Sequence, residues 1–249
     1  MIILKSPEEI AKMRLAGRIV ADARALVAEA VRPGVTTLDL DRIAEEHIIK
    51  SGATPSFKGY RGFPASICAS INEEVVHGIP AKRVLREGDI LSLDFGAIWE
   101  GYHGDSALTL FCGYPPSAEA EKLVRVTQDS LEAAISELRV GGRLSDVGHA
   151  VQQVVEGAGF SVIREYVGHG IGRSLHEDPQ IPNYGEPGRG PELKPGLVVA
   201  IEPMVTMGGW ETRVLDDDWT VVTADGSLSA HFEHTIALTD DGPEVLTAA

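Results

Sequence analysis

Four acidic residues occupy matching places beside apolar runs of the sequence. Asp94 and Glu202 each end such a run, whereas Asp105 and Glu233 each begin one. A carboxylate that is buried in a fold is costly unless it is paired or bound to a metal, and no cluster of Arg or Lys flanks these runs. An acid that faces water at a strand end would explain any one of the four but not the whole set. The set therefore favours cations as partners.

Three histidines lie in glycine-containing segments that suit a binding site. His169 and His176 share the stretch Gly168-His-Gly-Ile-Gly-Arg-Ser-Leu-His-Glu177, where glycine lets the backbone approach a ligand closely, and His77 precedes Gly78. We interpret these three as ligands or proton donors. The other histidines lack such a context and are expected to be structural: His47, His103, His149, His231 and His234.

Four carboxylates and one imidazole form a hard, oxygen-rich set of donors. This set suits a pair of divalent ions such as manganese, iron or cobalt better than a thiolate zinc site does. Two such ions close together lower the pKa of a bound water and polarise a carbonyl group. The chemistry that the sequence predicts is therefore hydrolysis.

Composition excludes several other classes of protein. The chain has 249 residues, and 37 Asp and Glu against 22 Lys and Arg give a net charge of −15, which argues against nucleic-acid binding. No apolar run approaches the ~20 residues that a membrane span needs. Charges at Lys5, Glu8 and Glu9 come too early for the core of a signal peptide, and we expect two reduced cysteines in a cytoplasmic protein.

The elements that position the acids follow from an internal duplication. Arg32-Pro-Gly34 recurs as Arg139-Val-Gly141, and the segment 85–94 matches the segment 193–202 at a nearly constant offset. Each copy begins with a helix-start signal, because Ser6-Pro-Glu-Glu9 is typical of a capping box and Ser117 precedes a second helical pattern. The repeats cover about 6–113 and 117–246 of a single catalytic domain, 1–249.

Each repeat has the pattern helix, glycine turn, second helix and then strands. We expect helices from Ile10 to the Pro33-Gly34 stop and over 38–49 and 147–155, and strands over 67–71, 90–95, 107–111, 198–201, 220–222 and 234–238. The junction lies at 114–117. The predicted fold class is α+β, with two halves related by a pseudo-twofold axis, helices covering a curved, mainly antiparallel sheet, and a cleft between the halves.

Three short motifs indicate a resemblance to a known family. Gly168-His-Gly-Ile-Gly172, Ile201-Glu-Pro-Met204 and Glu233-His-Thr235 are specific when they occur together, and over its whole length the chain resembles the type I methionine aminopeptidases. The resemblance implies a pita-bread fold in which Asp94 binds one metal ion, Asp105 and Glu233 bridge both, and His169 with Glu202 binds the other. Glu202 would also carry the proton, His77 would contact the scissile amide, and His176 would contact the carbonyl on which negative charge builds up.

The same resemblance implies a methionine pocket and a second kind of cation site. The pocket corresponds to Phe57, Tyr60, Phe63, Cys68, Leu175 and Trp219. Phe57 stands where a cysteine is common, Leu175 where a phenylalanine is common, and Arg61 where a histidine is frequent, so we expect a different pocket shape. A monovalent cation, Na⁺ or K⁺, is implied at Asn72, Glu74 and Ser229.

The expected activity is removal of the N-terminal methionine from nascent polypeptides when the second residue is small and uncharged. The cofactors would be two Co²⁺, Mn²⁺ or Fe²⁺ ions, with Zn²⁺ also compatible. The start of the first helix at Ser6 and the short spacing from His176 to Glu202 predict the minimal bacterial form. We expect a cytoplasmic monomer that works transiently near ribosomes, without a membrane and without tight binding to nucleic acid.

Two alternatives remain open at this point. A prolidase or aminopeptidase P has the same fold but carries an extra N-terminal domain. A metal-free binding module on this fold would have lost metal ligands, whereas all five are present in this chain. Metal analysis combined with a peptidase assay separates the three.

Overall fold

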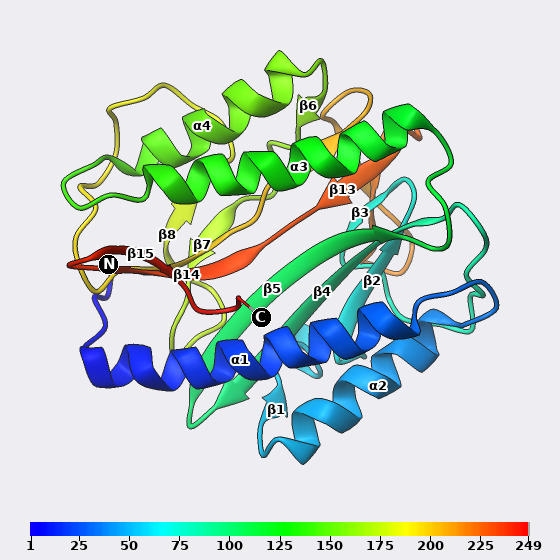
Figure 1. Ribbon diagram of the computed structural model, residues 1–249, viewed down its shortest axis with the longest axis horizontal. Coiled ribbons are helices and arrows are strands. Elements are labelled where there is room, and N and C mark those ends of the chain that lie inside the picture. Colours follow the sequence, from blue (N-terminus) through cyan, green and yellow to red (C-terminus); the bar gives the residue numbers. More distant parts are fainter. Residues whose placement is uncertain (249) are drawn as a thin grey trace.

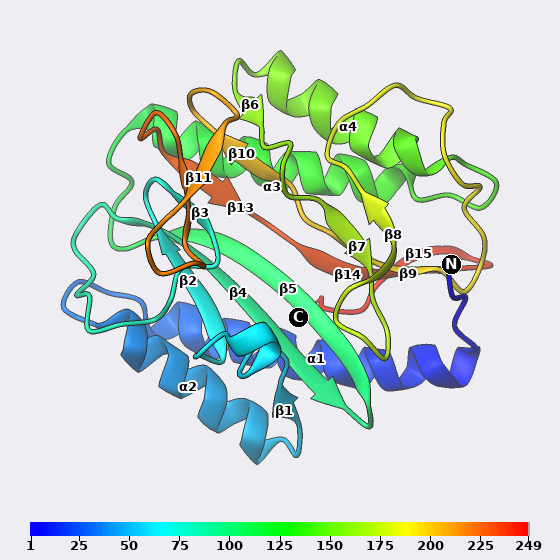
Figure 2. The ribbon, with the colours of Figure 1, turned by 180° about the vertical axis from the view of Figure 1, so that it is seen from behind.

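The computed structural model describes residues 1–248 and contains four α-helices in two pairs. They are α1 (Pro7–Ala30), α2 (Thr37–Lys50), α3 (Ala118–Glu137) and α4 (Leu144–Gly157), with a short 3-10 turn at Tyr60–Gly62. Figure 1 shows the α1–α2 pair and the α3–α4 pair in front of the strands, and Figure 2 shows the opposite side, where the four α-helices lie behind the strands. The expected layer of helices on one face is confirmed.

The helix starts agree with the sequence signals. The Ser6 hydroxyl accepts a hydrogen bond from the Glu9 backbone N–H, and the Glu9 carboxylate accepts one from the Ser6 N–H, so the capping box is formed. The Ser117 hydroxyl caps α3 by accepting from the Ala120 N–H, without a reciprocal bond because the third helical residue is alanine. The buried side chains of α1 recur at helical spacing along one face, which is why this helix lies flat on the strands.

The strands form four sheets in which every pairing is antiparallel. In chain order the strands are β1 (Thr54–Pro55), β2 (Ile67–Ile71), β3 (Glu74–Val76), β4 (Ile90–Trp99), β5 (Tyr102–Phe111), β6 (Ser161–Val162), β7 (Gly168–Gly170), β8 (Glu177–Ile181), β9 (Val198–Ile201), β10 (Met204–Thr206), β11 (Thr212–Val214), β12 (Val221–Thr223), β13 (Ser229–His231), β14 (His234–Thr239) and β15 (Gly242–Val245). The two largest sheets are β1-β4-β2 with β5 on β4, and β15-β14-β9-β7-β8.

β5 begins earlier than its apolar run predicts. It pairs with β4 from Trp99↔Tyr102 to Ile90↔Phe111, so the hairpin includes polar residues that the sequence pattern had placed before the strand. Asp105 therefore lies inside β5, opposite Gly96, rather than at its start. The two carboxylates of the first half are held on neighbouring strands of one hairpin.

The duplication is visible in matching backbone contacts. Gly34 N–H donates to Leu85 O at 2.9 Å in the first half, and Gly141 N–H donates to Leu193 O at 2.9 Å in the second. Isolated bridges at Thr36↔Val84 and Arg143↔Glu192 follow the same correspondence. The turn after the first helix of each repeat is therefore attached to the same place on its own half.

Each half has its own apolar core, and a third cluster lies between them. One core packs α1 and α2 on β2 and β4, and the other packs α3 and α4 on β9 and β14. The third cluster contains Phe57, Phe63, Cys68 and Leu175 and is bordered by Tyr60 and Trp219. This cluster forms the apolar wall of the site described next. Within residues 1–248, no helix combines the length and apolarity that crossing a bilayer would require.

Candidate active site

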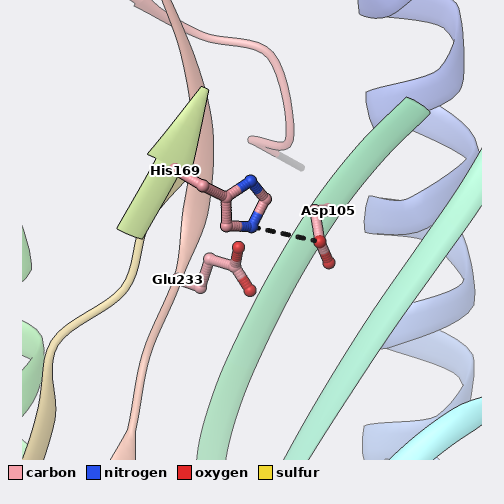
Figure 3. Close-up of side chains that lie close together, drawn as sticks. All are labelled: Asp105, His169 and Glu233. Carbon is pink, nitrogen blue, oxygen red and sulfur yellow. Dashed lines mark ion pairs between the residues drawn. The ribbon is translucent and has the colours of Figure 1, made fainter. Parts of the chain in front are cut away.

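The predicted metal-binding residues converge on one cavity of about 160 Å³. Asp94 comes from β4, Asp105 from β5 and His169 from β7, while Glu202 follows β9 and Glu233 lies between β13 and β14. Donor atoms of Asp105, His169 and Glu233 all lie within 4.8 Å of one another, and Figure 3 shows these three side chains pointing toward a common centre. All five residues line the cavity.

The two halves meet at this cavity through backbone hydrogen bonds. Ala107 N–H donates to Glu233 O at 3.2 Å, and Glu233 N–H donates to Ala107 O at 3.0 Å. The Ser106 hydroxyl adds a third bond to Glu233 O at 2.7 Å. These contacts fix Glu233 beside β5, which carries Asp105, so the repeat-related acids face each other.

Asp105 has donor groups of both halves as neighbours. His169 Nε2 lies 3.4 Å from Glu202 Oε1 and 4.0 Å from Asp105 Oδ2. Asp94 is on the strand paired with that of Asp105, and burial together with the charge of Asp94 raises the pKa of Asp105. Asp105 therefore belongs to the first half and lies close to His169 of the second.

Burial disfavours the charged form of every carboxyl group in the cavity. It raises the pKa of Asp94 from 3.8 to about 7. Burial, followed by the negative charges of the neighbouring carboxylates, raises the pKa of Asp105 and Glu233 well above the usual range, and burial with the charge of Asp94 does the same for the pKa of Glu202. Four acids with raised pKa values at one place form a site that attracts cations.

Several polar atoms in this region have no hydrogen-bond partner. Asp94 Oδ1, Asp105 Oδ1 and Glu233 Oε1 are buried without one, and so is His231 Nε2. Among residues 1–248, no Lys or Arg forms an ion pair with any of the four carboxylates. Buried polar atoms are normally satisfied. Unsatisfied carboxylate oxygens that point into one cavity therefore fit divalent metal ions.

His169 has the tautomer that a metal ligand needs. Its Nδ1 lies 2.9 Å from Gly170 O, and a carbonyl only accepts, so Nδ1 carries the proton. Nε2 then presents its lone pair to Asp105 and Glu202. Burial lowers the pKa of His169 to about 4, which keeps the ring neutral near pH 7. A second hydrogen bond that orients the ring is typical of metal-bound histidine.

The other two predicted histidines border the same cavity. The His176 ring centroid is 4.2 Å from that of His169, and His176 Nδ1 lies 2.9 Å from the Tyr60 hydroxyl. The His77 ring meets Trp219 and Tyr166 edge to face, at centroid distances of 6.3 and 5.8 Å. Burial lowers the pKa of His77 to about 4, and burial with the positive charge of Arg61 lowers the pKa of His176. Both rings are available as neutral hydrogen-bonding groups.

The residues predicted for a methionine pocket form the apolar wall of the cavity. Phe57, Phe63, Cys68 and Leu175 are buried, whereas Tyr60 and Trp219 are partly exposed. Phe63 and Trp219 meet edge to face at 5.1 Å. Arg61, which the sequence marks as a departure, also lines the cavity, with its guanidinium 5.3 Å from the centre of the Tyr60 ring. The wall is apolar, with one cation beside it.

The structure brings two of the three residues predicted for a monovalent cation into contact. Ser229 N–H donates to Asn72 O at 2.9 Å, and Asn72 has a positive φ of 60°. The Glu74 carboxylate accepts from Ile71 N–H at 2.8 Å and pairs with Arg83 at 2.5 Å. The cation site at these residues stays a prediction.

One residue that sequence reasoning assigned to a structural role lies at the site. His231 is 2% exposed, and its Nε2 is 3.9 Å from Glu202 Oε2. Burial lowers the pKa of His231 to about 3. Its spacing of two from Glu233 was a signal that could have found it, because alternate residues of an extended chain point to the same side. His103, by contrast, bonds the Ser56 hydroxyl at 2.9 Å, as a structural histidine does.

Comparisons with known proteins agree with this geometry. The model of metallopeptidase family M24 matches residues 11–240. A methionine aminopeptidase of Clostridium acetobutylicum is 56% identical over 248 residues, which cover 99% of each chain. The crystal structure of a methionine aminopeptidase from Thermotoga maritima has 51% identity and a TM-score of 0.98, with full coverage of both chains.

A more distant structure shares the fold alone. The prolidase from Pyrococcus furiosus is 21% identical, with a TM-score of 0.79 over 99% of this chain and 66% of its own. Its identity is far below that of the aminopeptidase relatives.

Proposed function

The chain belongs to metallopeptidase family M24 and has its pita-bread fold, and we propose that it removes the N-terminal methionine from polypeptides whose second residue is small and uncharged. The activity class is that of a methionine aminopeptidase. One observation carries the proposal: four carboxylates and His169 line one cavity, beside an apolar wall, without a Lys or Arg partner among residues 1–248.

Two divalent metal ions fit this set of donors. Asp94 would hold one ion, His169 with Glu202 the other, and Asp105 with Glu233 both. The donor atoms of Asp105, Glu233 and His169 lie within 4.8 Å of one another, which supports this assignment. Co²⁺, Mn²⁺ and Fe²⁺ all accept these ligands, and Zn²⁺ is compatible. When bound, such a pair of ions lowers the pKa of a water molecule and polarises the scissile carbonyl.

Three residues of the chain would handle protons and developing charge. The Glu202 carboxylate faces the cavity and would take a proton from the attacking water and deliver it to the leaving amine. His176, held by the Tyr60 hydroxyl, would donate to the carbonyl oxygen as negative charge develops there. His77, at the opposite rim beside Trp219, would contact the amide that is cleaved.

The apolar wall would select the first side chain. Phe57, Phe63 and Trp219 offer ring faces and edges, against which a flexible, polarizable thioether packs well. No carboxylate lies among these wall residues, so a Lys or Arg side chain at the first position would be buried there without a partner. The free α-amine of the substrate would lie next to Asp94, which explains why an acylated N-terminus should be rejected.

The second residue and the biological setting are inferred from the same site. The second residue would meet the chain around His77 and His176, so we propose that the small side chains Gly, Ala, Ser, Thr, Pro, Val and Cys are favoured after the methionine. Such N-termini occur on nascent polypeptides, so we propose a cytoplasmic monomer that acts transiently near ribosomes. The net charge of −15 supports action without tight binding to nucleic acid. A Na⁺ or K⁺ ion beside Asn72, Glu74 and Ser229 is part of the proposal, as is the extent of the catalytic domain, 1–249.

The test is reconstitution of metal-free protein under anaerobic conditions. Freshly prepared apoprotein is titrated with Fe(II), Mn(II), Co(II) or Zn(II), and hydrolysis of Met-Ala-Ser is followed. Activity should rise until about two ions are bound per chain. Full activity with no bound metal would refute the proposal and point to a different catalytic apparatus, whereas a protein with neither bound metal nor activity would fit the metal-free binding module.

A peptide panel tests the specificity. Met-Ala-Ser and Met-Gly-Met should be cleaved, their N-acetylated forms should not, and Met-Lys or Met-Glu peptides should be poor substrates. Efficient cleavage of Leu-, Lys- or Ala-Pro-initiated peptides, with Met-Ala-Ser untouched, would favour a prolidase-like enzyme instead.

A further inference from the structure

We propose that Lys5 is a positioning residue of the active site: bound to Glu177, it holds the loop 171–176 so that His176 faces the cavity. The inference rests on the proposed function, because it explains how a residue of that function is placed. It concerns the N-terminal segment before α1, to which neither the motifs nor the composition assigned a role.

The Lys5–Glu177 ion pair is buried. Lys5 Nζ lies 2.5 Å from Glu177 Oε2 and also donates to Ile3 O at 3.0 Å. The two side chains are 4% and 9% exposed, and no other Lys or Arg ion pair within residues 1–248 has both partners so enclosed. Removing one member of a buried pair is strongly unfavourable, because the other charge is left without compensation. This pair therefore ties the N-terminal segment firmly to the chain around Glu177.

The loop 171–176 packs directly on this pair. Glu177 Oε1 accepts from Ser174 N–H at 3.1 Å, and Gly172 N–H donates to Ser174 O at 3.1 Å. A methyl group on Gly172 would lie 2.6 Å from Lys5 Cε and 2.7 Å from Glu177 Oε1, so a larger residue there would displace the two side chains of the ion pair. The loop 171–176 therefore packs against the side chains of the Lys5–Glu177 ion pair.

The backbone of the Lys5 segment is itself fixed. Lys5 N–H donates to Gly196 O at 2.7 Å, in the turn that precedes β9. The capped start of α1 follows at Ser6. Figure 2 shows the N-terminal segment entering beside β9 and continuing into α1. The backbone of Lys5 is thus held at Gly196 and at the start of α1, so its side chain reaches Glu177 from a fixed position.

The loop carries two side chains of the proposed site. Leu175 belongs to the apolar wall, and His176 is held from the far side by the Tyr60 hydroxyl at 2.9 Å. Glu177 is the next residue after His176, so its position sets where that ring can lie. Four of the five predicted metal ligands are on other segments of the chain. The fifth, His169, directly precedes the loop, and the pairing of β7 with β9 should hold it in place when the loop moves.

The first measurement is independent of activity. Hydrogen exchange followed by mass spectrometry should show faster deuterium uptake over 171–177 in Lys5→Met, with β4 and β5 unchanged. The control is Arg14→Met, which removes a more exposed pair with Glu244 from α1 and should leave uptake over 171–177 unchanged. Unchanged uptake in a folded Lys5→Met protein would overturn the inference.

The second measurement is a double-mutant cycle with His176→Ala. A misplaced catalytic group can cost up to about a hundredfold in rate, so Lys5→Met should lower kcat by about tenfold or more at normal metal content. In the His176→Ala background it should lower kcat by less than about twofold, because the group that it positions is absent. Lys5→Arg should restore most of the rate. An equal loss in both backgrounds would mean that Lys5 does not act through His176, and would refute the inference.

A Lys5→Met protein that does not fold and a wild-type protein that is inactive can both be distinguished from a failure of this inference. If Lys5→Met does not fold, Glu177→Gln, which keeps an acceptor for the Ser174 N–H, is judged by the same exchange and kinetic criteria. If the wild-type protein fails to cleave Met-Ala-Ser with any metal, the proposed function fails, while exchange over 171–177 still decides whether Lys5 holds the loop.

Discussion

Replacing Asp94 by asparagine should stabilise the metal-free protein, and the gain should grow with pH. In the absence of a cation, Asp94 shares a cavity with Asp105, Glu202 and Glu233 and has no Lys or Arg partner within residues 1–248. Burial raises its pKa from 3.8 to about 7, so the folded protein holds this proton more tightly than the unfolded chain does. An asparagine of the same shape carries no charge that must be buried.

The sign and size of the effect follow from proton linkage. For an acid whose folded-state pKa is raised, stability is fully present below the unfolded-state pKa and is lost as pH rises through the folded-state value. From 3.8 to about 7, the loss caused by Asp94 amounts to about 4 kcal/mol. About 2 kcal/mol of this falls between pH 5.5 and 8. Asp94 also raises the pKa of Asp105, so removing its charge adds a contribution of the same sign.

The assay compares the unfolding of two chelator-treated proteins, wild type and Asp94→Asn. The free energy of unfolding is measured in urea from pH 5.5 to 8. Buried histidines change the stability in the opposite direction, since burial lowers the pKa of His169 to about 4 and that of His231 to about 3. These histidines are present in both proteins, so the difference between the two free energies isolates the carboxylate.

Metal should reverse the order of stability. Addition of Mn(II) or Co(II) stabilises a folded state that binds it, so the wild type should gain at pH 7.5 and Asp94→Asn should gain much less. The reasoning is refuted if metal-free Asp94→Asn is less stable than metal-free wild type at pH 8. It is equally refuted if the difference in free energy is the same at pH 5.5 and pH 8.

Further variants separate the roles of the site residues. Glu233→Gln should fold but lose bound metal and activity, measured by metal analysis and Met-Ala-Ser hydrolysis; wild-type turnover at full metal loading would contradict the dinuclear site. Glu202→Gln should keep at least one ion and lose orders of magnitude in kcat, because a ligand and a proton carrier disappear together. His77→Ala and His176→Ala should bind metal normally and lose about 10²–10³ in kcat; loss of metal from either would show it to be a ligand. His231→Leu should lower kcat at unchanged metal content, since a buried Nε2 beside Glu202 is removed; an unchanged rate would show a packing role alone.

The sequence brings the four predicted acids to one cavity because the duplication constrains them. Asp94 and Glu202 end equivalent apolar runs; Asp94 lies within β4 and Glu202 follows β9, and these two strands pair with β5 and β14 in the two largest sheets. Asp105 was placed at the start of a strand and lies within one, because backbone pairing with β4 continues through polar residues that an apolar pattern does not include. Pairing is a property of two strands, and a pattern along one strand underestimates it.

Residues that act from a distance in sequence could not be found in the same way. His231 has no glycine beside it, and its place near Glu202 depends on the packing of β13 against the segment after β9. Lys5 lies in the N-terminal segment and pairs with Glu177, which is far away in the sequence. A single lysine before a helix cap forms no sequence pattern that would indicate a buried partner. Both positions are set by tertiary contacts, which periodicity and motif spacing do not contain.

The duplication also explains why so many like charges can be gathered at one place. Each half contributes only two of the four acids, and the ligand set is completed when the backbone bonds between Ala107 and Glu233 join the halves. The repulsion between Asp105 and Glu233 and their desolvation therefore depend on this contact between the halves, and a divalent cation bound there would offset both. Metal binding should for this reason be linked to the packing of one half on the other rather than to the stability of either half.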